Sequence, residues 1–180
     1  PWTDIAVAGK DISCWGRTYT FDGSVFVTQI ESAGAQLLSV PMQLEGLIDS
    51  SNRTLQSGTT SITLQRVDRV EMVANESMGP LPVQVSTWIE YDGLCWIDIE
   101  LQPTAPTTVS NLRIRMGLDD QYATLFSSDD AFLNGTGAVQ SSWNREYTYR
   151  DAQFWIGDED RGFYWFAKSD ENWSLDSPEY

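Results

Sequence analysis

Hydrophobic and polar residues alternate with a period of two along much of the chain, which is the pattern of half-buried β-strands. The alternation is clearest in residues 59–67, 70–77 and 109–118, and turn residues separate such segments about every eight to twelve positions. No segment of about ten residues or more combines a helical period with helix caps. The pattern predicts an all-β fold, an antiparallel two-sheet β-sandwich, in a single domain over residues 1–180.

The sharpest local signal is a predicted hairpin of residues 83–91 and 94–102, joined by Asp92-Gly93. A two-residue Asp-Gly loop is typical of a type I′ turn, in which both central residues have positive φ. This loop would place Ile89 opposite Trp96. The predicted core face of the second strand consists of Cys95, Ile97, Ile99 and Leu101. Residues 49–58, rich in Ser, Asn and Gly, are predicted to form a loop.

A second hairpin is predicted near the C-terminus, with residues 153–157 and 162–168 flanking an acidic turn. Alternation puts aromatic side chains on both faces, whereas a sheet in a sandwich has one inward face. The outward set would form an apolar surface of the size that marks a contact site. We therefore expect at least two of five side chains to be exposed: Trp155, Tyr164, Trp165, Phe166 and Trp173.

The charge balance excludes several classes of function. The chain has 26 acidic and 11 basic residues, a net charge of −15, and no histidine. Such an acidic chain would be repelled by nucleic acid and by an anionic membrane surface, so we expect neither as a partner. Without histidine, a Ser-His-Asp triad or a His-ligated metal cannot form. No apolar stretch approaches the ~20 residues of a membrane helix.

Other features of the composition favour secretion into an extracellular or periplasmic space. Lysine is scarce, Ser and Thr are abundant, and four Asn-x-Ser/Thr sequons occur, at Asn52, Asn75, Asn134 and Asn172. Since the sequence starts at Pro1 without Met, we expect that the native N-terminus, with any export signal, lies outside it.

The two cysteines, Cys14 and Cys95, are too few for a structural zinc site, which takes about four ligands. Two interpretations are open: a disulfide, or two buried small hydrophobic residues. We favour the second, because free cysteine is among the most buried residue types.

Eight tryptophans make aromatic contacts the first candidates for function. An aromatic face stacks on the C–H groups of a sugar ring, while acidic and amide side chains bind its hydroxyls. The candidate residues for a carbohydrate or domain contact are Trp143, Trp155, Tyr164, Trp165 and Trp173. The alternative is that tryptophan fills the core, and we favour it for Trp88, Trp155 and Trp165.

Acidic residues provide weaker candidates. Asp98 and Glu100 alternate on one strand about 7 Å apart, a spacing compatible with a glycosidase acid and base, but any acidic strand shows it, so we assign no catalytic residue. Asp158 and Asp160 are weak Ca²⁺ candidates, although a solvated turn is the preferred interpretation and no cofactor is predicted. Arg17 is expected to pair with a buried acid such as Glu90.

Four segments together resemble a known family: residues 15–21 (WGRTYTF), 30–42 (IESAGAQLLSVPM), 88–94 (WIEYDGL) and 154–173 (FWIGDEDRGFYWFAKSDENW). Their order resembles the N-terminal β-sandwich region of large bacterial proteins related to glycoside hydrolase family 123. The resemblance implies that a (β/α)₈ barrel follows, which hydrolyses N-acetylgalactosaminides with substrate assistance and carries the catalytic acids. Tyr180 would then lie just before that barrel.

Two functional hypotheses follow. In the first, the chain is a non-catalytic accessory domain of a secreted glycoside hydrolase and packs on the catalytic barrel of the same polypeptide. In the second, it is an autonomous carbohydrate-binding module that recognises glycans through exposed Trp and Tyr. Catalysis by this chain alone is the least favoured alternative.

Overall fold

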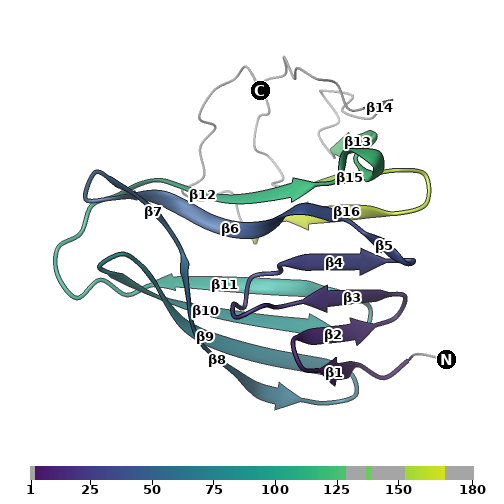
Figure 1. The fold of residues 1–180 in the computed structure, drawn as a ribbon, viewed down its shortest axis with the longest axis horizontal. Coiled ribbons are helices and arrows are strands. Elements are labelled where there is room, and N and C mark those ends of the chain that lie inside the picture. The colour runs from purple at the N-terminus through teal and green to yellow at the C-terminus, as the bar shows by residue number, and fades with distance from the viewer. Residues whose placement is uncertain (1–2, 129–136, 139–152, 169–180) are drawn as a thin grey trace. The chain divides into compact units, whose positions relative to one another are not determined.

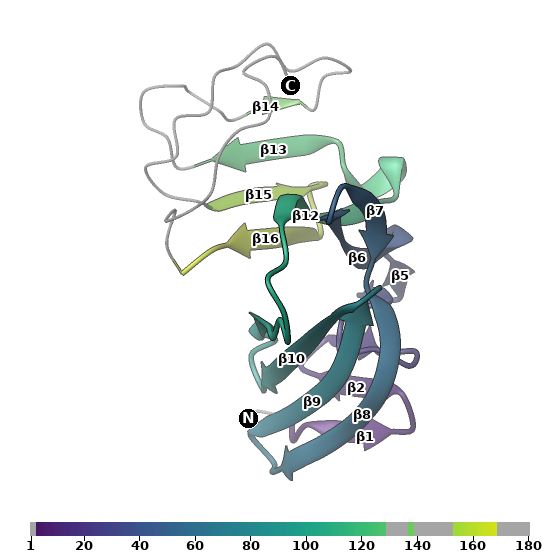
Figure 2. The ribbon, with the colours of Figure 1, turned by 90° about the vertical axis from the view of Figure 1, so that its left-hand side faces the viewer.

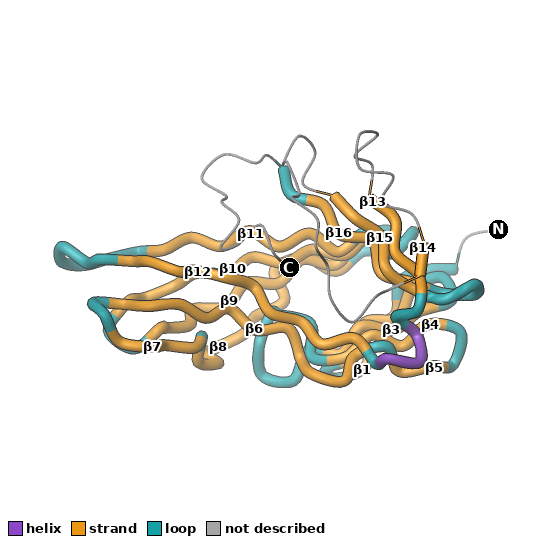
Figure 3. Tube along the Cα trace, turned by 90° about the horizontal axis from the view of Figure 1, so that it is seen from above, coloured by secondary structure: helices purple, strands orange, loops and turns teal. Residues whose placement is uncertain are grey.

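The computed structural model describes residues 3–128, 137–138 and 153–168, and internal contacts divide the chain into two compact units, Pro1–Gly117 and Leu118–Tyr180. The described strands form four sheets, which we call A to D (Figure 1). In the described part, helix is limited to the 3₁₀ turn η1 at Asp120–Tyr122, purple in Figure 3. The prediction of an all-β, antiparallel protein is confirmed, whereas a single domain over residues 1–180 stays a prediction.

Sheet A is a meander of five short antiparallel strands that pair in chain order: β1 (Ala6–Ala8), β2 (Asp11–Cys14), β3 (Arg17–Thr20), β4 (Gln29–Ser32) and β5 (Ala35–Gln36). The apolar run before β4 contributes to the core without joining the sheet. Val25, Phe26 and Val27 are almost completely buried, yet they lie outside any strand.

Sheet C has the order β11-β10-β9-β8 and consists of β8 (Gln56–Gln65), β9 (Arg69–Met78), β10 (Leu81–Glu90) and β11 (Cys95–Leu101). Figure 2 shows β8, β9 and β10 curving side by side. Every second residue of β9 and β10 is buried, as the period-two pattern predicts. The buried residues are Val70, Met72, Ala74, Glu76, Met78, Leu81, Val83, Val85, Thr87 and Ile89.

Sheets A and C pack face to face and enclose the core of the first unit (Figure 1). Each fully buried Val, Ile or Leu side chain contributes about 1.5–3 kcal/mol by leaving water. Side-chain hydrogen bonds cross between the layers. The Thr87 hydroxyl donates to the Val25 carbonyl at 2.7 Å, and the Tyr19 hydroxyl donates to the Gly93 carbonyl at 2.6 Å. The predicted β-sandwich is therefore present in this unit.

The loop of the β10–β11 hairpin differs from the predicted type I′ turn. It has three residues, because the Glu90 amide donates to Leu94 and the Gly93 amide donates back to Glu90, both at 2.9 Å. Within the loop, positive φ occurs at Gly93 (88°) and not at Asp92. This is a type I turn followed by a left-handed glycine, the usual three-residue hairpin loop.

The extra loop residue shifts every cross-strand pair by one position. Ile89 lies opposite Cys95 and Trp88 lies opposite Trp96, so the predicted pairing of Ile89 with Trp96 is wrong. The four residues assigned to the core face do face inward with Ile89. They are only half-buried, however, because β11 is an edge strand of sheet C.

Sheet B contains a type I′ turn that the sequence did not suggest. Its order is β12-β6-β7, with β6 (Leu38–Ile48), β7 (Ser51–Thr54) and β12 (Val109–Leu118). Ile48 pairs with Ser51, and the two residues between them, Asp49 and Ser50, have φ values of 47° and 65°. The predicted loop at 49–58 is therefore wrong: it holds this turn, β7 and the start of β8.

A side-chain amide connects sheet A to β6. The Gln29 side chain donates to the Leu38 carbonyl at 2.9 Å and accepts from the Leu38 amide at 2.8 Å. These are the two hydrogen bonds that a paired strand residue would make. The amide thus takes the place of a backbone pair between β4 of sheet A and the first residue of β6.

Strand β8 lies at the other edge of sheet C and is exposed along most of its length, with Ile62 46% exposed. Its pairing with β9 is interrupted twice by register shifts, between Gln56 and Thr59 and between Ile62 and Leu64. A strand is present here as predicted, but the prediction that it is half-buried is wrong, because the core ends at β9.

Candidate functional site

The predicted aromatic hairpin forms two strands of sheet D in the second unit. The sheet has the order β14-β13-β15-β16 (Figure 2), with β13 (Leu125–Ser128), β14 (Gly137–Ala138), β15 (Gln153–Gly157) and β16 (Gly162–Phe166). Trp155 lies opposite Tyr164, and Phe154 lies opposite Trp165. This register puts aromatic side chains on both faces of the hairpin, as alternation predicts.

One face of the hairpin carries the most exposed rings of the sheet. Tyr164 is 52% exposed and Phe166 is 37% exposed, and their ring centroids lie 6.0 Å apart. The Tyr164 hydroxyl donates a hydrogen bond to the side chain of Gln153, its diagonal neighbour on β15. We call Gln153, Trp155, Tyr164 and Phe166 the exposed aromatic face.

Trp155 belongs to this face but is half-buried, because its ring lies over the backbone of two glycines. A Cβ added at Gly157 or at Gly162 would overlap the Trp155 indole. The pair of glycines, which lie opposite each other in the register, leaves the space that this ring occupies. The aromatic face is thus shaped by residues that have no side chain.

On the other face, the rings pack on one another and are half-buried. Phe126 stacks on Phe154 with centroids 5.9 Å apart, and Phe163 lies 6.5 Å from Trp165. The expectation that at least two of five aromatic residues are exposed is confirmed by Tyr164 and Phe166. The other candidates, Trp143 and Trp173, lie outside the described residues.

The acidic turn between β15 and β16 is organised by Asp158. Its Oδ1 atom accepts hydrogen bonds from the amides of Asp160 and Arg161, at 2.8 and 2.7 Å. These amides and the Arg161 guanidinium, 3.6 Å away, lower the pKa of Asp158. Asp160 also lies 3.5 Å from Arg161. A cationic side chain therefore occupies the position between the two candidate Ca²⁺ ligands, and the described residues hold no group of three or more potential metal ligands.

A second aromatic cluster lies on the outer face of sheet C. Trp88 and Trp96 stack with centroids 5.9 Å apart and an interplanar angle of 13°. The Arg69 guanidinium lies 4.1 Å from the centre of the Trp88 ring, a cation–π contact worth about 0.5–1 kcal/mol at a partly exposed site. Three adjacent strands thus contribute one stack, which we call the Arg69–Trp88–Trp96 ladder.

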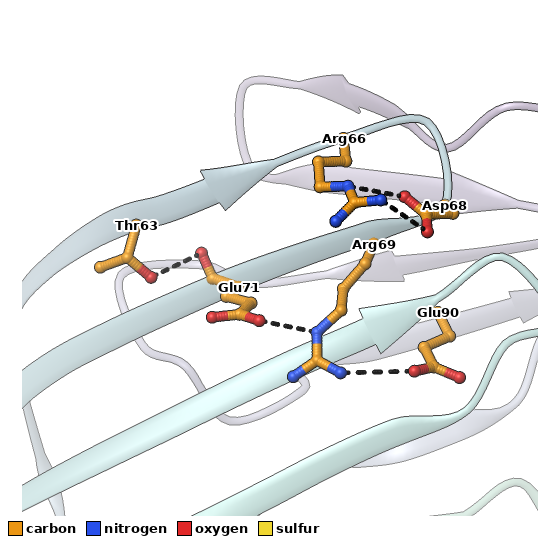
Figure 4. Close-up of polar contacts among 6 residues, drawn as sticks. All are labelled: Thr63, Arg66, Asp68, Arg69, Glu71 and Glu90. Carbon is orange, nitrogen blue, oxygen red and sulfur yellow. Dashed lines mark hydrogen bonds and ion pairs between the residues drawn. The ribbon is translucent and has the colours of Figure 1, made fainter.

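Carboxylates hold the arginine of this ladder in place (Figure 4). Arg69 lies 2.7 Å from Glu71 on its own strand and 3.4 Å from Glu90 on β10. Glu90 was expected to pair with Arg17, but its register partner is Arg69. In the neighbouring turn Arg66 forms a separate pair with Asp68 at 3.1 Å. Since these groups are partly exposed, each pair contributes about 0–1 kcal/mol.

The ladder was missed from the sequence because the predicted register separated its two tryptophans. With the observed register, Trp88 and Trp96 are directly opposite. Trp88 contacts Arg69 and Trp96 on the outer face and is half-buried, so the prediction that it fills the core is wrong. The sequence signal for this cluster is an Arg at the start of one strand, followed by two Trp that flank the turn of the next hairpin.

The sequence profile of one protein family matches residues 5–175, nearly the whole chain. The family is described as "Glycoside hydrolase 123, third domain". The chain belongs to this family. The resemblance stated from its motifs is confirmed, although the description numbers the domain third, whereas the resemblance placed it in the N-terminal region. No curated protein matches the chain.

In this third domain of glycoside hydrolase 123, Asp98 and Glu100 lie on β11, the edge strand of sheet C. Both are exposed on the outer face of β11, opposite Ser86 and Gln84. Their side chains therefore face water beside polar neighbours. No helix in the described part of the domain is long and apolar enough to cross a membrane.

Proposed function

We propose that this chain is a non-catalytic accessory domain of a secreted bacterial glycoside hydrolase, and that it docks on the (β/α)₈ catalytic domain of the same polypeptide through the exposed aromatic face. Membership of the glycoside hydrolase 123 third-domain family supports the enzyme context. The observation that carries the docking surface is the exposure of Tyr164 and Phe166, which alternate with Trp165 and so share one face of β16.

The exposed aromatic face is a surface that we expect another molecule or domain to cover. Two large rings that remain exposed side by side retain apolar area that water disfavours, and such patches mark interaction sites. Aromatic residues are also enriched among the residues that dominate the energy of protein interfaces. In a multidomain enzyme, a neighbouring domain is held at high effective concentration, so even a weak contact of this size is occupied.

The test uses the parent enzyme's catalytic domain, expressed separately, and this chain added in trans. Calorimetric titration should detect binding, and the double variant Tyr164→Ser, Phe166→Ser should weaken it by about tenfold or more, since truncated interface anchors cost roughly 1–4 kcal/mol. Ile62→Ser is the matched control, because Ile62 is also an exposed large apolar residue, 46% exposed, but lies on β8. Equal binding by the double variant and the control would refute this docking surface.

A carbohydrate-binding module is the second candidate, and one observation favours it. An exposed tyrosine whose hydroxyl is joined to a glutamine amide combines a ring for stacking on a sugar with groups that bind hydroxyls. The same variants decide between the two functions. Binding of N-acetylgalactosamine oligosaccharides that is lost in the double variant, together with no binding to the catalytic domain, would replace the docking proposal.

A further inference from the structure

The two cysteines lie at the same end of the sandwich interior, one on each sheet. Cys14 ends β2 in sheet A, is buried, and pairs with Arg17. Cys95 begins β11 in sheet C and lies opposite Ile89, which is completely buried. Both thiols are free in the structure. Cys95 therefore contributes to the inner surface that sheet A covers.

Two contacts bring these strand ends together. The Tyr19 hydroxyl of β3 donates to the Gly93 carbonyl, two residues before Cys95, at 2.6 Å. The Arg17 side chain, next to Cys14 in the register, lies against Gly93 so closely that an added Cβ would be 2.6 Å from its Cδ atom. The β2–β3 end of sheet A is thus fastened to the β10–β11 loop of sheet C.

The thiols are also near enough to act on each other electrostatically. Burial, and then the neighbouring Cys14, raise the pKa of Cys95 to about 12. Burial raises the pKa of Cys14 as well, while Arg17 acts in the opposite direction. Burial, and then Cys95 and Cys14, raise the pKa of Tyr19. Groups that influence one another's ionisation in this way share one small interior region.

We propose that Cys14 and Cys95 form a disulfide that joins the two sheets when the chain folds in the presence of a low-molecular-weight disulfide oxidant. One cysteine thiolate attacks the oxidant and releases one thiol. The second thiolate then attacks the mixed disulfide and releases the other thiol. The protein loses two protons and two electrons, and the oxidant is reduced to two thiols. A secreted chain would meet such oxidising conditions.

This cross-link would act mainly on the unfolded chain, because it closes a loop of roughly 80 residues. The disulfide would keep the two sheets joined at Cys14 and Cys95 when the core between them unfolds. Because Cys14 is buried and Cys95 is half-buried, we expect the oxidant to reach them faster during folding than in the folded protein.

The test is to refold the full chain with oxidised glutathione and, separately, with excess reductant. Thiols are then counted in denaturant and the intact mass is measured. We expect the oxidised chain to be a monomer with no free thiol and a mass about 2 Da lower. Its melting temperature should be higher than that of the reduced chain by roughly 5–15 °C.

The variants Cys14→Ala and Cys95→Ala each leave one thiol, so oxidation should add glutathione or leave that thiol free, and neither variant should show the rise in melting temperature. Two free thiols, glutathione adducts or disulfide-linked dimers of the oxidised wild-type chain would overturn the proposal. A chain that refolds only with reductant would overturn it too, because the cross-link would then oppose the fold.

Discussion

Replacing Glu76 by glutamine should stabilise the sandwich at neutral pH. Glu76 lies on the inner face of β9 and is 5% exposed. Its Oε1 atom accepts a hydrogen bond from the Ser24 hydroxyl at 3.0 Å, while Oε2 has no hydrogen-bond partner in the described part of the chain. Burial raises the pKa of Glu76, and hydrogen bonds from Ser24 and the Val25 amide only partly offset this.

The sign of the pH effect follows from the raised pKa. The stability contributed by Glu76 is fully present below the ordinary pKa of 4.5 and is lost as the pH rises through the higher folded value. A buried polar group without a partner costs about 1–3 kcal/mol. Glutamine removes the charge but keeps a polar group at the same place, so we expect a gain near the lower limit, about 1 kcal/mol or 2–4 °C at neutral pH.

Urea titrations monitored by tryptophan fluorescence measure the difference between Glu76→Gln and wild type. The difference should be smallest near pH 4 and should grow toward about pH 7.5. Glu100→Gln is the control, because Glu100 is exposed on β11 of the same sheet. A difference that does not change with pH, or that Glu100→Gln reproduces, would refute the assignment of a destabilising buried charge.

Four further substitutions test local features. Ser50→Gly should stabilise by about 0.5 kcal/mol in thermal melts, because Ser50 has a φ of 65° that glycine adopts without strain; a loss of stability would contradict the type I′ turn. Gly162→Ala should destabilise by roughly 1–3 kcal/mol and change the near-ultraviolet circular dichroism, since the new methyl group displaces the Trp155 ring; an unchanged spectrum would show that the ring lies elsewhere. Ile89→Ala should cost about 2–5 kcal/mol and half-buried Ile99→Ala clearly less; equal losses would argue against β11 as an edge strand.

The positions of the strands were easier to predict from the sequence than the register in which they pair. Alternation predicted the strands Val109–Leu118 and Gln153–Gly157 with their observed bounds. The position of a strand could be predicted because the alternating pattern lies within one continuous segment of the chain. Register depends instead on the conformation of a loop. Asp92-Gly93 forms part of a three-residue loop, whereas Asp49 and Ser50, without glycine, form the type I′ turn.

Exposure and ion pairing were harder to predict because they depend on neighbours distant in sequence. Nothing in the pattern of β8 shows that it lies at a sheet edge, where its apolar Ile62 faces water. The partner of Glu90 is set by the register between β9 and β10, which brings Arg69 opposite it. The exposed aromatic face could be predicted from the sequence. Aromatic residues occupy both odd and even positions of one hairpin, so some of them must lie on the outward face.

The broken pairing of β8 bears on how this protein behaves at high concentration. An edge strand presents amide and carbonyl groups to which a strand from another molecule can add, and long regular edges promote aggregation. The two register shifts in β8 interrupt that row, and its side chains are mostly Ser, Thr and Gln. The irregular edge therefore protects the domain from association through sheet extension, and straightening it by deleting a bulge residue would favour fibrous assembly.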